Sequence, residues 1–168
     1  MNLKLTLILA FAITFASCSK DKKIERKLPK GDGIWNITSA AYVFTEQDVN
    51  DVNISQAISS GTKSNIGSFT FGKDGIGSFS FTIDSFTREG SFTWMVVEEE
   101  VSIVYTYINL ADIFSGTGDY DQVVGAFSGI WEKNSWTLNG GDVEQHFDGT
   151  GNMDVTQTVL AGTFELSN

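Results

Sequence analysis

The chain has 168 residues, and its 21 acidic residues outnumber the 11 basic ones, which gives a formal net charge of −10. A chain this acidic has no basic patch with which to neutralise phosphates, so we expect no nucleic-acid partner. The single histidine excludes zinc sites built from several histidines, and Cys–His catalysis is excluded because the single cysteine is expected not to be a free thiol.

The first 17 residues are expected to be an export signal. Lys4 precedes an apolar run over residues 5–16, and this run is shorter than the ~20 apolar residues that a membrane-spanning helix needs. A basic start, a short apolar run and small residues before a cleavage point are typical of a secretory signal peptide. We therefore predict that residues 1–17 are removed on export.

Cys18, the only cysteine, follows Ala16 and Ser17 at the end of the apolar run. Residues 15–18, Phe-Ala-Ser-Cys, resemble the bacterial lipobox, in which the cysteine sulfur receives a diacylglycerol and the cysteine becomes the first residue. The resemblance implies lipidation of Cys18, with acyl chains such as palmitate. Two or more acyl chains hold a protein stably on a membrane. We expect attachment to the outer membrane, facing either the periplasm or the cell surface.

Residues 18–30 are expected to be the lipidated cysteine followed by a polar tether. Residues 19–30 hold six of the eleven basic residues and the only proline, Pro29. Such a segment is either a solvated linker or a basic stretch that lies on anionic head groups, and both alternatives stay open. Residues 31–168 then carry four basic and nineteen acidic residues, a formal net charge of −15, and are long enough for one domain.

Alternating apolar and polar residues predict that this domain is all-β. The predicted strands are residues 34–44, 67–71, 77–83, 85–97, 101–107, 122–131, 134–138 and 152–166. Residues 72–75 are expected to form a hairpin turn and residues 98–100 an exposed hairpin tip. A helical turn is expected at residues 110–114, and a flap across one end of the fold at residues 46–66.

The last strand changes its apolar phase, which predicts a β-bulge near Ala161 and Gly162. Because most successive strands are joined by short hairpins, we predict an eight-stranded antiparallel up-and-down barrel, which removes its sheet edges by closing. A β-sandwich is the alternative, although Greek-key sandwiches need longer connections and this chain has only two.

The first predicted strand opens with Gly33-Ile34-Trp35. Gly-x-Trp at this place resembles the lipocalin (calycin) superfamily, in which the tryptophan packs across the closed base of the barrel. The wider pattern resembles lipocalin-like domain lipoproteins of Bacteroidetes-type bacteria. The motifs that carry it are Phe69-Thr70-Phe71, Asp74-Gly75, Gly77-Ser78-Phe79 and Phe92-Thr93-Trp94. The resemblance implies a lipocalin-like barrel in which Gly33 and Trp35 are fold-signature residues.

The thirteen Phe, four Trp and four Tyr residues suggest two roles for aromatic side chains. They either fill the barrel, since eight-stranded barrels can be packed solid, or they line a cavity for a small apolar ligand. In the second case the lining residues are expected to be Trp94, Tyr105, Tyr107 and Trp136.

No catalytic residues are expected. His146, the sole histidine, lies in a Gly- and Asp-rich segment typical of a surface turn, and no Gly-x-Ser-x-Gly motif is present. We expect no cofactor and no metal site. Weak calcium binding stays open at two acidic stretches, residues 48–53 and the segment that holds Asp119 and Asp121.

The sequence thus predicts a monomeric, non-catalytic lipoprotein of the cell envelope whose barrel binds a small apolar ligand. The alternative is a structural or interaction lipoprotein that engages an envelope protein or a glycan through its loops.

Overall fold

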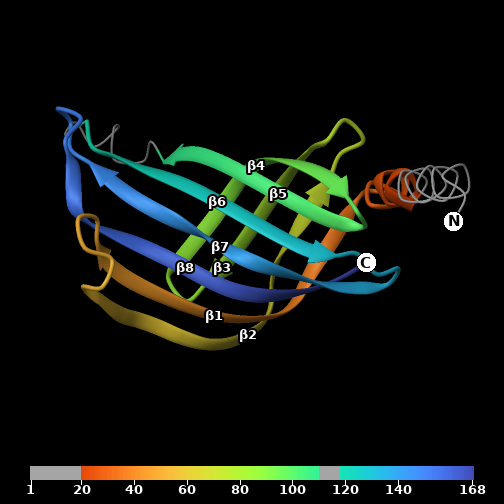
Figure 1. Cartoon of the computed structure of the whole chain (residues 1–168), viewed down its shortest axis with the longest axis horizontal. Helices are drawn as coiled ribbons and strands as arrows, with labels where there is room; N and C mark the ends of the chain where they lie inside the picture. The colour runs from red at the N-terminus through yellow and green to blue at the C-terminus, as the bar shows by residue number, and fades with distance from the viewer. Residues whose placement is uncertain (1–19, 110–117) are drawn as a thin grey trace, which may run out of the picture.

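The computed structural model describes residues 20–109 and 118–168. They contain a closed barrel of eight antiparallel strands in chain order, in which the last strand pairs with the first (Figure 1). The strands are β1 (Ile34–Asp48), β2 (Ser55–Phe71), β3 (Ile76–Ile83), β4 (Phe86–Val97), β5 (Glu100–Asn109), β6 (Tyr120–Ile130), β7 (Ser135–Phe147) and β8 (Met153–Ser167). The predicted up-and-down barrel is confirmed, and the β-sandwich alternative is wrong because the sheet is continuous and closed.

The expected flap over residues 46–66 is wrong. Residues 55–66 belong to β2 and pair with β1 in register, for example Ala41 with Thr62, so the β1–β2 connection is only residues 49–54. Most side chains of β2 from Ser55 to Asn65 are exposed. This part of the strand therefore has no apolar face, and it lacks the alternation from which strands are predicted.

The expected β-bulge near Ala161 and Gly162 is also absent. The register of β8 runs without a shift through these residues on both of its neighbours. Leu160, Phe164 and Leu166 are buried, whereas Met153 and Val155 are exposed. The apolar phase changes because apolar side chains of β8 occupy the inner face at one end of the strand and the outer face at the other.

The β3–β4 hairpin runs at an angle to the strands around it (Figure 1). β3 pairs with β2 only over Gly67–Phe71, and β4 pairs with β5 only over Thr93–Val97. At the hairpin tip, Asp84 accepts hydrogen bonds from Tyr42 Oη at 2.6 Å and Ser59 Oγ at 2.5 Å. Its other carboxylate oxygen lies 2.8 Å from Lys63 Nζ. Side chains therefore attach the hairpin tip to β1 and β2.

Residues 20–27 form a helix that packs on the base of the barrel, the end at which β1 starts and β8 ends. Ile24 and Leu28 are buried in the core, and Trp35 Nε1 donates to the Leu28 carbonyl at 3.1 Å. A solvated linker therefore does not describe residues 20–28. Among the described residues, no helix is long and apolar enough to span a membrane.

The helix is also held at its start. Lys20 Nζ lies 2.6 Å from Glu99 Oε1, and the Asp21 carboxylate accepts the backbone N–H groups of Glu98 and Glu99 at 3.2 and 2.8 Å. Glu98 and Glu99 form the β4–β5 turn with positive φ angles, so Asp21 stabilises a turn that is strained for these residues. Glu100 is the first residue of β5. Three predictions lie outside the described residues: the signal peptide over residues 1–17, lipidation of Cys18 and a helical turn at residues 110–114.

Candidate functional site

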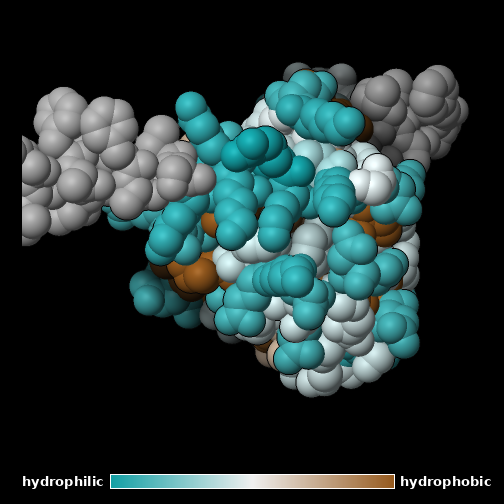
Figure 2. Space-filling view, turned by 90° about the vertical axis from the view of Figure 1, so that its right-hand side faces the viewer, coloured by the Kyte–Doolittle hydropathy of each residue, from teal (hydrophilic) through white to brown (hydrophobic). Residues whose placement is uncertain are grey.

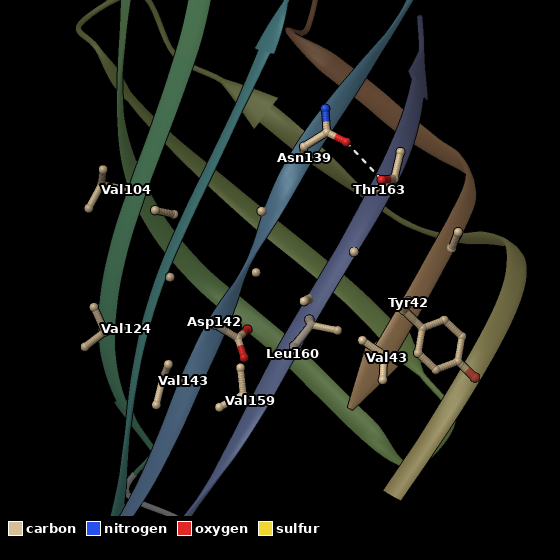
Figure 3. A pocket seen from close by; sticks show the side chains of 17 residues that line it. Tyr42, Val43, Val104, Val124, Asn139, Asp142, Val143, Val159, Leu160 and Thr163 are labelled. Carbon is tan, nitrogen blue, oxygen red and sulfur yellow. Dashed lines mark hydrogen bonds between the residues drawn. The ribbon is translucent and has the colours of Figure 1, made fainter. Parts of the chain in front are cut away.

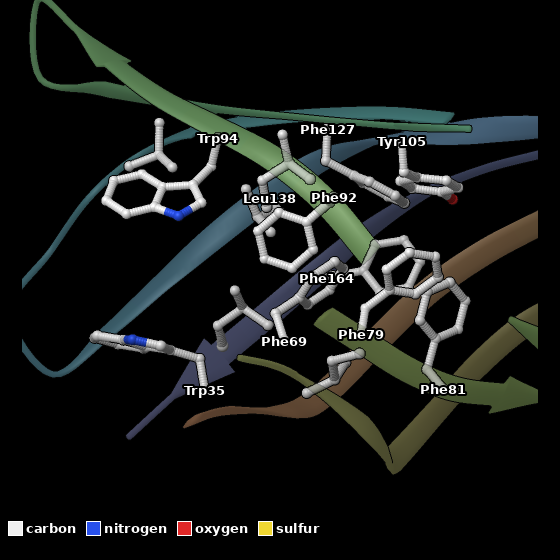
Figure 4. Close-up of a cluster of buried hydrophobic side chains, with 14 of the residues drawn as sticks. Trp35, Phe69, Phe79, Phe81, Phe92, Trp94, Tyr105, Phe127, Leu138 and Phe164 are labelled. Atoms are coloured by element: carbon white, nitrogen blue, oxygen red, sulfur yellow. The ribbon is translucent and has the colours of Figure 1, made fainter. Parts of the chain in front are cut away.

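Aromatic rings fill the barrel from its base to its middle (Figure 4). Phe69 lies at the centre, with ring-centroid distances of 6.0 Å to Phe79, 5.8 Å to Phe92 and 5.9 Å to Phe127. Phe127 in turn packs against Phe164 at 5.0 Å. The rings of β2, β3, β4, β6 and β8 thus meet one another in the lumen. Of the two roles proposed for aromatic residues, filling the barrel describes this region.

The four residues predicted to line a ligand cavity lie in two separate groups. Trp94 and Trp136 lie at the base on either side of Phe71, with centroid distances of 5.6 and 6.1 Å, and both are buried. Tyr105 and Tyr107 stack on each other at 6.3 Å beyond the middle of the barrel. The structure therefore places these residues in the core without bringing all four around one cavity.

The fold-signature residues form part of the base. Trp35 packs edge-on against Trp136 at 5.9 Å and is only 2% exposed. Gly33 has a φ of 71°, and a Cβ atom there would lie 2.3 Å from the Phe71 carbonyl oxygen. Only glycine suits this position, because it needs both a left-handed backbone and close approach of another strand.

A buried ionic cluster lies next to the aromatic core, on the side away from the base of the barrel. Arg88 of β4 is 3% exposed; its Nε donates to Asp142 Oδ2 of β7 at 3.1 Å, and its Nη2 donates to Glu144 Oε2 at 2.9 Å. Tyr105 donates its hydroxyl proton to the same Asp142 oxygen at 2.8 Å. Three strands therefore meet in one polar cluster inside the barrel.

The pKa values in this cluster follow from burial and charge. Burial lowers the pKa of Arg88, but the Asp142 and Glu144 carboxylates outweigh it and hold that pKa above its usual value. Burial and the Asp142 charge raise the pKa of Tyr105 well above its usual range, and burial is also the main cause that raises the pKa of Tyr107 to about 12. At neutral pH Tyr105 is neutral and donates to Asp142, and Tyr107 is neutral beside the Arg88 guanidinium.

One oxygen of the cluster has no partner. Asp142 Oδ1 is buried and makes no hydrogen bond among the described residues, although Oδ2 accepts two. A buried carboxylate oxygen left without a donor costs free energy, so this atom is the place where a water molecule or a ligand hydroxyl would bind.

The Arg88 cluster was not predicted from the sequence, although a signal for it exists. In β4 the even-numbered residues Phe92, Trp94 and Val96 face the core, and Arg88 occupies the same phase. A charged residue at a strand position that faces the core, among apolar neighbours on the same face, indicates a buried ion pair. Its partner lies on another strand and has no comparable local signal.

His146 and the acidic loops form no cluster of metal ligands among the described residues. His146 Nδ1 lies 2.8 Å from Asp121 Oδ1, which raises the histidine pKa, and its side chain is 39% exposed. Asp48 and Asp51 accept backbone N–H groups within their own loop. No group of three or more His, Cys, Asp or Glu residues in the described part of the chain could hold a metal ion.

The outer wall of the barrel carries a hollow of about 910 Å³ that crosses β5, β6, β7, β8 and β1 (Figure 3). Its floor is a row of small residues in register, in which Gly141 of β7 lies between Ala126 and Ala161. The neighbouring row is Val124, Val143 and Val159. We call this hollow the outer groove; its outward-facing residues are Ala41, Val43, Val104, Val124, Ala126, Asn139, Gly141, Val143, Val159, Ala161 and Thr163.

The two rows of residues that border the outer groove carry no charged side chain; beyond them, Glu165 lies two residues past Thr163 on the same face of β8. On one side, Gln122, Gln145, Gln157 and Gln47 lie side by side across β6, β7, β8 and β1. On the other side lie Ser102, Ser128, Asn139 and Thr163, of which the last two share a hydrogen bond of 2.9 Å. In a domain with a formal charge of −15, this wall is an apolar floor with a neutral hydrogen-bonding rim. Its register across five strands could not be predicted from the sequence.

No protein family, curated protein or solved structure matches this chain in the comparisons.

Proposed function

We propose that this protein is a lipid-anchored, non-catalytic binding protein of the cell envelope, and that it binds a small apolar ligand in the outer groove rather than in the lumen. The observation that carries the proposal is the placement of apolar surface. Aromatic side chains fill the lumen from its base to its middle, and the buried ionic cluster of Arg88 lies beyond them, whereas the outer groove offers about 910 Å³ lined mainly by Val, Ala and Gly. This volume suits small-molecule sites, which occupy roughly 300–1,000 Å³.

The shape and charge of the outer groove indicate the kind of ligand. Five strands spaced by about 4.8 Å give a groove roughly 19 Å long. Since neither its floor nor its rim carries a charge, an ionised head group would lose hydration there without gaining a partner. The ligand is therefore elongated, apolar and uncharged, with hydroxyl or amide groups at most on the edge that faces Asn139 and Thr163.

The lipid anchor rests on the lipobox-like residues 15–18, and lipocalin-like identity rests on the Gly33-to-Trp35 motif and the barrel. Outer-membrane placement follows from the anchor. Mass spectrometry of the N-terminal peptide of protein isolated from its membrane tests this part, since lipidation adds a diacylglycerol mass to Cys18. An unmodified Cys18 in mature protein would overturn it.

Native mass spectrometry of the protein exposed to lipid extracts tests the ligand. We expect a bound apolar mass on the wild-type protein and its loss in Ala161→Leu, because the larger side chain fills the groove floor. Ala57→Leu is the matched control, since Ala57 is also exposed but lies on β2 outside the outer groove. Equal ligand mass on both variants, or a bare wild-type protein, would contradict the site.

The uncharged wall supports a second candidate function, docking of another envelope protein or a neutral glycan. Protein interfaces combine an apolar, charge-depleted core with a polar rim, and the outer groove with its glutamine row has this composition. A photo-crosslinking residue at Val124 separates the two functions in intact cells. A defined protein or glycan adduct supports docking, and adducts with small molecules alone support the first function.

A further inference from the structure

We propose that a lysine-rich hollow at the base of the barrel binds the phosphate group of an anionic lipid and so seats the base on the membrane. The hollow measures about 390 Å³ and joins three parts of the chain: the end of the helix, the start of β1 and the β6–β7 turn. Lys27, Lys30 and Lys133 line it, together with Trp131 and Asn134. This base site lies apart from the outer groove.

The three lysines are free to bind an anion. None of them forms an ion pair with a described residue, whereas Lys20 and Lys63 do. Lys27 Nζ lies 5.6 Å from the centroid of the Trp131 ring, a contact that holds the side chain without neutralising its charge. Two carboxylates lie next to lining residues of the hollow: Glu132, beside Lys133 in the turn, and Asp32, beside Gly31 before β1, whose Oδ1 accepts the Ile34 N–H at 3.1 Å.

The base faces the membrane if Cys18 carries the lipid. The inference therefore rests on one part of the proposed function, the lipid anchor. Cys18 precedes the first described residue of the helix, Lys20, by two positions, and two residues span at most about 7 Å. Lys27 lies one helix length further, about 10 Å away at 1.5 Å per residue. The hollow is therefore within reach of the head groups around the anchor. Hydrophilic side chains cover most of this end of the molecule (Figure 2).

The distribution of charge supports the same orientation. Residues 20–30 hold six basic residues, and Lys73 and Lys133 occupy turns at the base, so only Lys63 and Arg88 lie elsewhere after residue 19. Both of these pair with carboxylates. Unpaired positive charge is thus confined to the base. Trp131 beside three lysines also has the composition of a membrane interface, where indole rings lie at head-group level and lysines reach phosphates.

Sedimentation with vesicles tests the base site in protein that begins at Ser19, which contains all of the described structure and lacks the lipid. We expect binding to vesicles of phosphatidylcholine with phosphatidylglycerol and none to phosphatidylcholine alone. Lys30→Gln and Lys133→Gln should each weaken binding about fivefold, since a lysine near an anionic surface contributes ~1 kcal/mol. Lys73→Gln is the matched control, because it removes the same charge at the same end but outside the hollow.

Two results would overturn the base site: equal binding to neutral vesicles, or equal weakening by Lys73→Gln. Displacement from vesicles by inorganic phosphate at constant ionic strength would support it, because free phosphate competes with lipid phosphate for the same lysines. Binding of inorganic phosphate without any binding to phosphatidylglycerol vesicles would also overturn it, and would assign the hollow to free phosphate. The protein that begins at Ser19 lacks Cys18. A failure of the base site in this experiment would therefore not contradict the lipid anchor or the outer groove, which are tested separately.

Discussion

Arg88 and Asp142 face each other across the barrel, with Nε of the arginine 3.1 Å from Oδ2 of the aspartate and both side chains almost completely buried. The pair joins the β3–β4 hairpin to β7, a strand with which the hairpin shares no backbone pairing. Phe86 of the same hairpin stacks on Phe44 at 4.2 Å. The part of the hairpin that pairs with neither β2 nor β5 is thus held in place by side chains of β7 and β1.

Arg88→Met should destabilise the protein by about 3–5 kcal/mol, because removal of one member of a buried ion pair leaves an uncompensated charge. The free energy of unfolding in urea measures this loss. Replacing both members, as in Arg88→Met with Asp142→Leu, should restore part of the stability, because two apolar side chains leave no buried charge from this pair. A double variant no more stable than Arg88→Met, or a single loss below about 1 kcal/mol, would show that the pair is not electrostatically important.

Stability should fall at high pH because of Tyr107. An unfolded tyrosine titrates near pH 10, whereas burial raises the pKa of Tyr107 to about 12. Between these values the unfolded chain releases a proton that the folded protein retains, so stability present below pH ~10 is lost as the pH rises toward 12. Denaturant unfolding across this range should show a shallower decline for Tyr107→Phe than for wild type. Parallel curves would contradict a raised pKa.

The helix before the barrel should contribute to stability. Leu28 is fully buried and its carbonyl accepts from Trp35. Leu28→Ala should cost about 2–5 kcal/mol, as expected for a large-to-small change in a core. Val52→Ala is the control: Val52 is 62% exposed in the β1–β2 loop, and its replacement should change stability by no more than about 0.5 kcal/mol. A similar small effect at Leu28 would mean that the helix does not pack firmly on the base in solution.

The sequence was informative where the buried face of a strand is apolar. Phe79, Phe81 and Ile83 alternate with polar residues in β3, and their period gave the strand and its inner face. The early part of β2 has no such alternation because it is exposed on both sides, so a polar strand could not be distinguished from a loop. The second half of β7, residues 139–147, was not predicted, because its inner face carries Gly140, Asp142 and Glu144. The helix at residues 20–27 had a weak signal, since Ile24 and Leu28 are four residues apart and lie on one helical face.

The binding surfaces were less predictable than the fold. Trp94, Tyr105, Tyr107 and Trp136 were expected around a ligand, but an aromatic residue on an inner face serves a filled core equally well. The outer groove depends on the register of five strands, which places Ala126, Gly141 and Ala161 in one row. Each strand contributes a single small residue, so no local pattern shows the row before the pairing is known.

Gly141 offers a direct test of the strand geometry beneath the outer groove. A Cβ atom at Gly141 would lie 1.7 Å from the Leu160 carbonyl oxygen of the paired strand, and backbone atoms cannot move aside as a side chain does. Gly141→Ala should therefore force β7 and β8 apart and cost about 1–3 kcal/mol or more. It should also weaken ligand binding, because the floor of the outer groove would change shape.

Gly61→Ala is the matched control, because the nearest atom to its Cβ would be Tyr42 Oη at 3.6 Å, an ordinary contact. There the substitution should leave stability unchanged or raise it by up to about 1 kcal/mol, since alanine restricts the unfolded chain. Urea unfolding of the two variants compares a glycine required by close strand approach with one that is not. Equal stability of both variants would show that β7 and β8 are further apart than the structure places them.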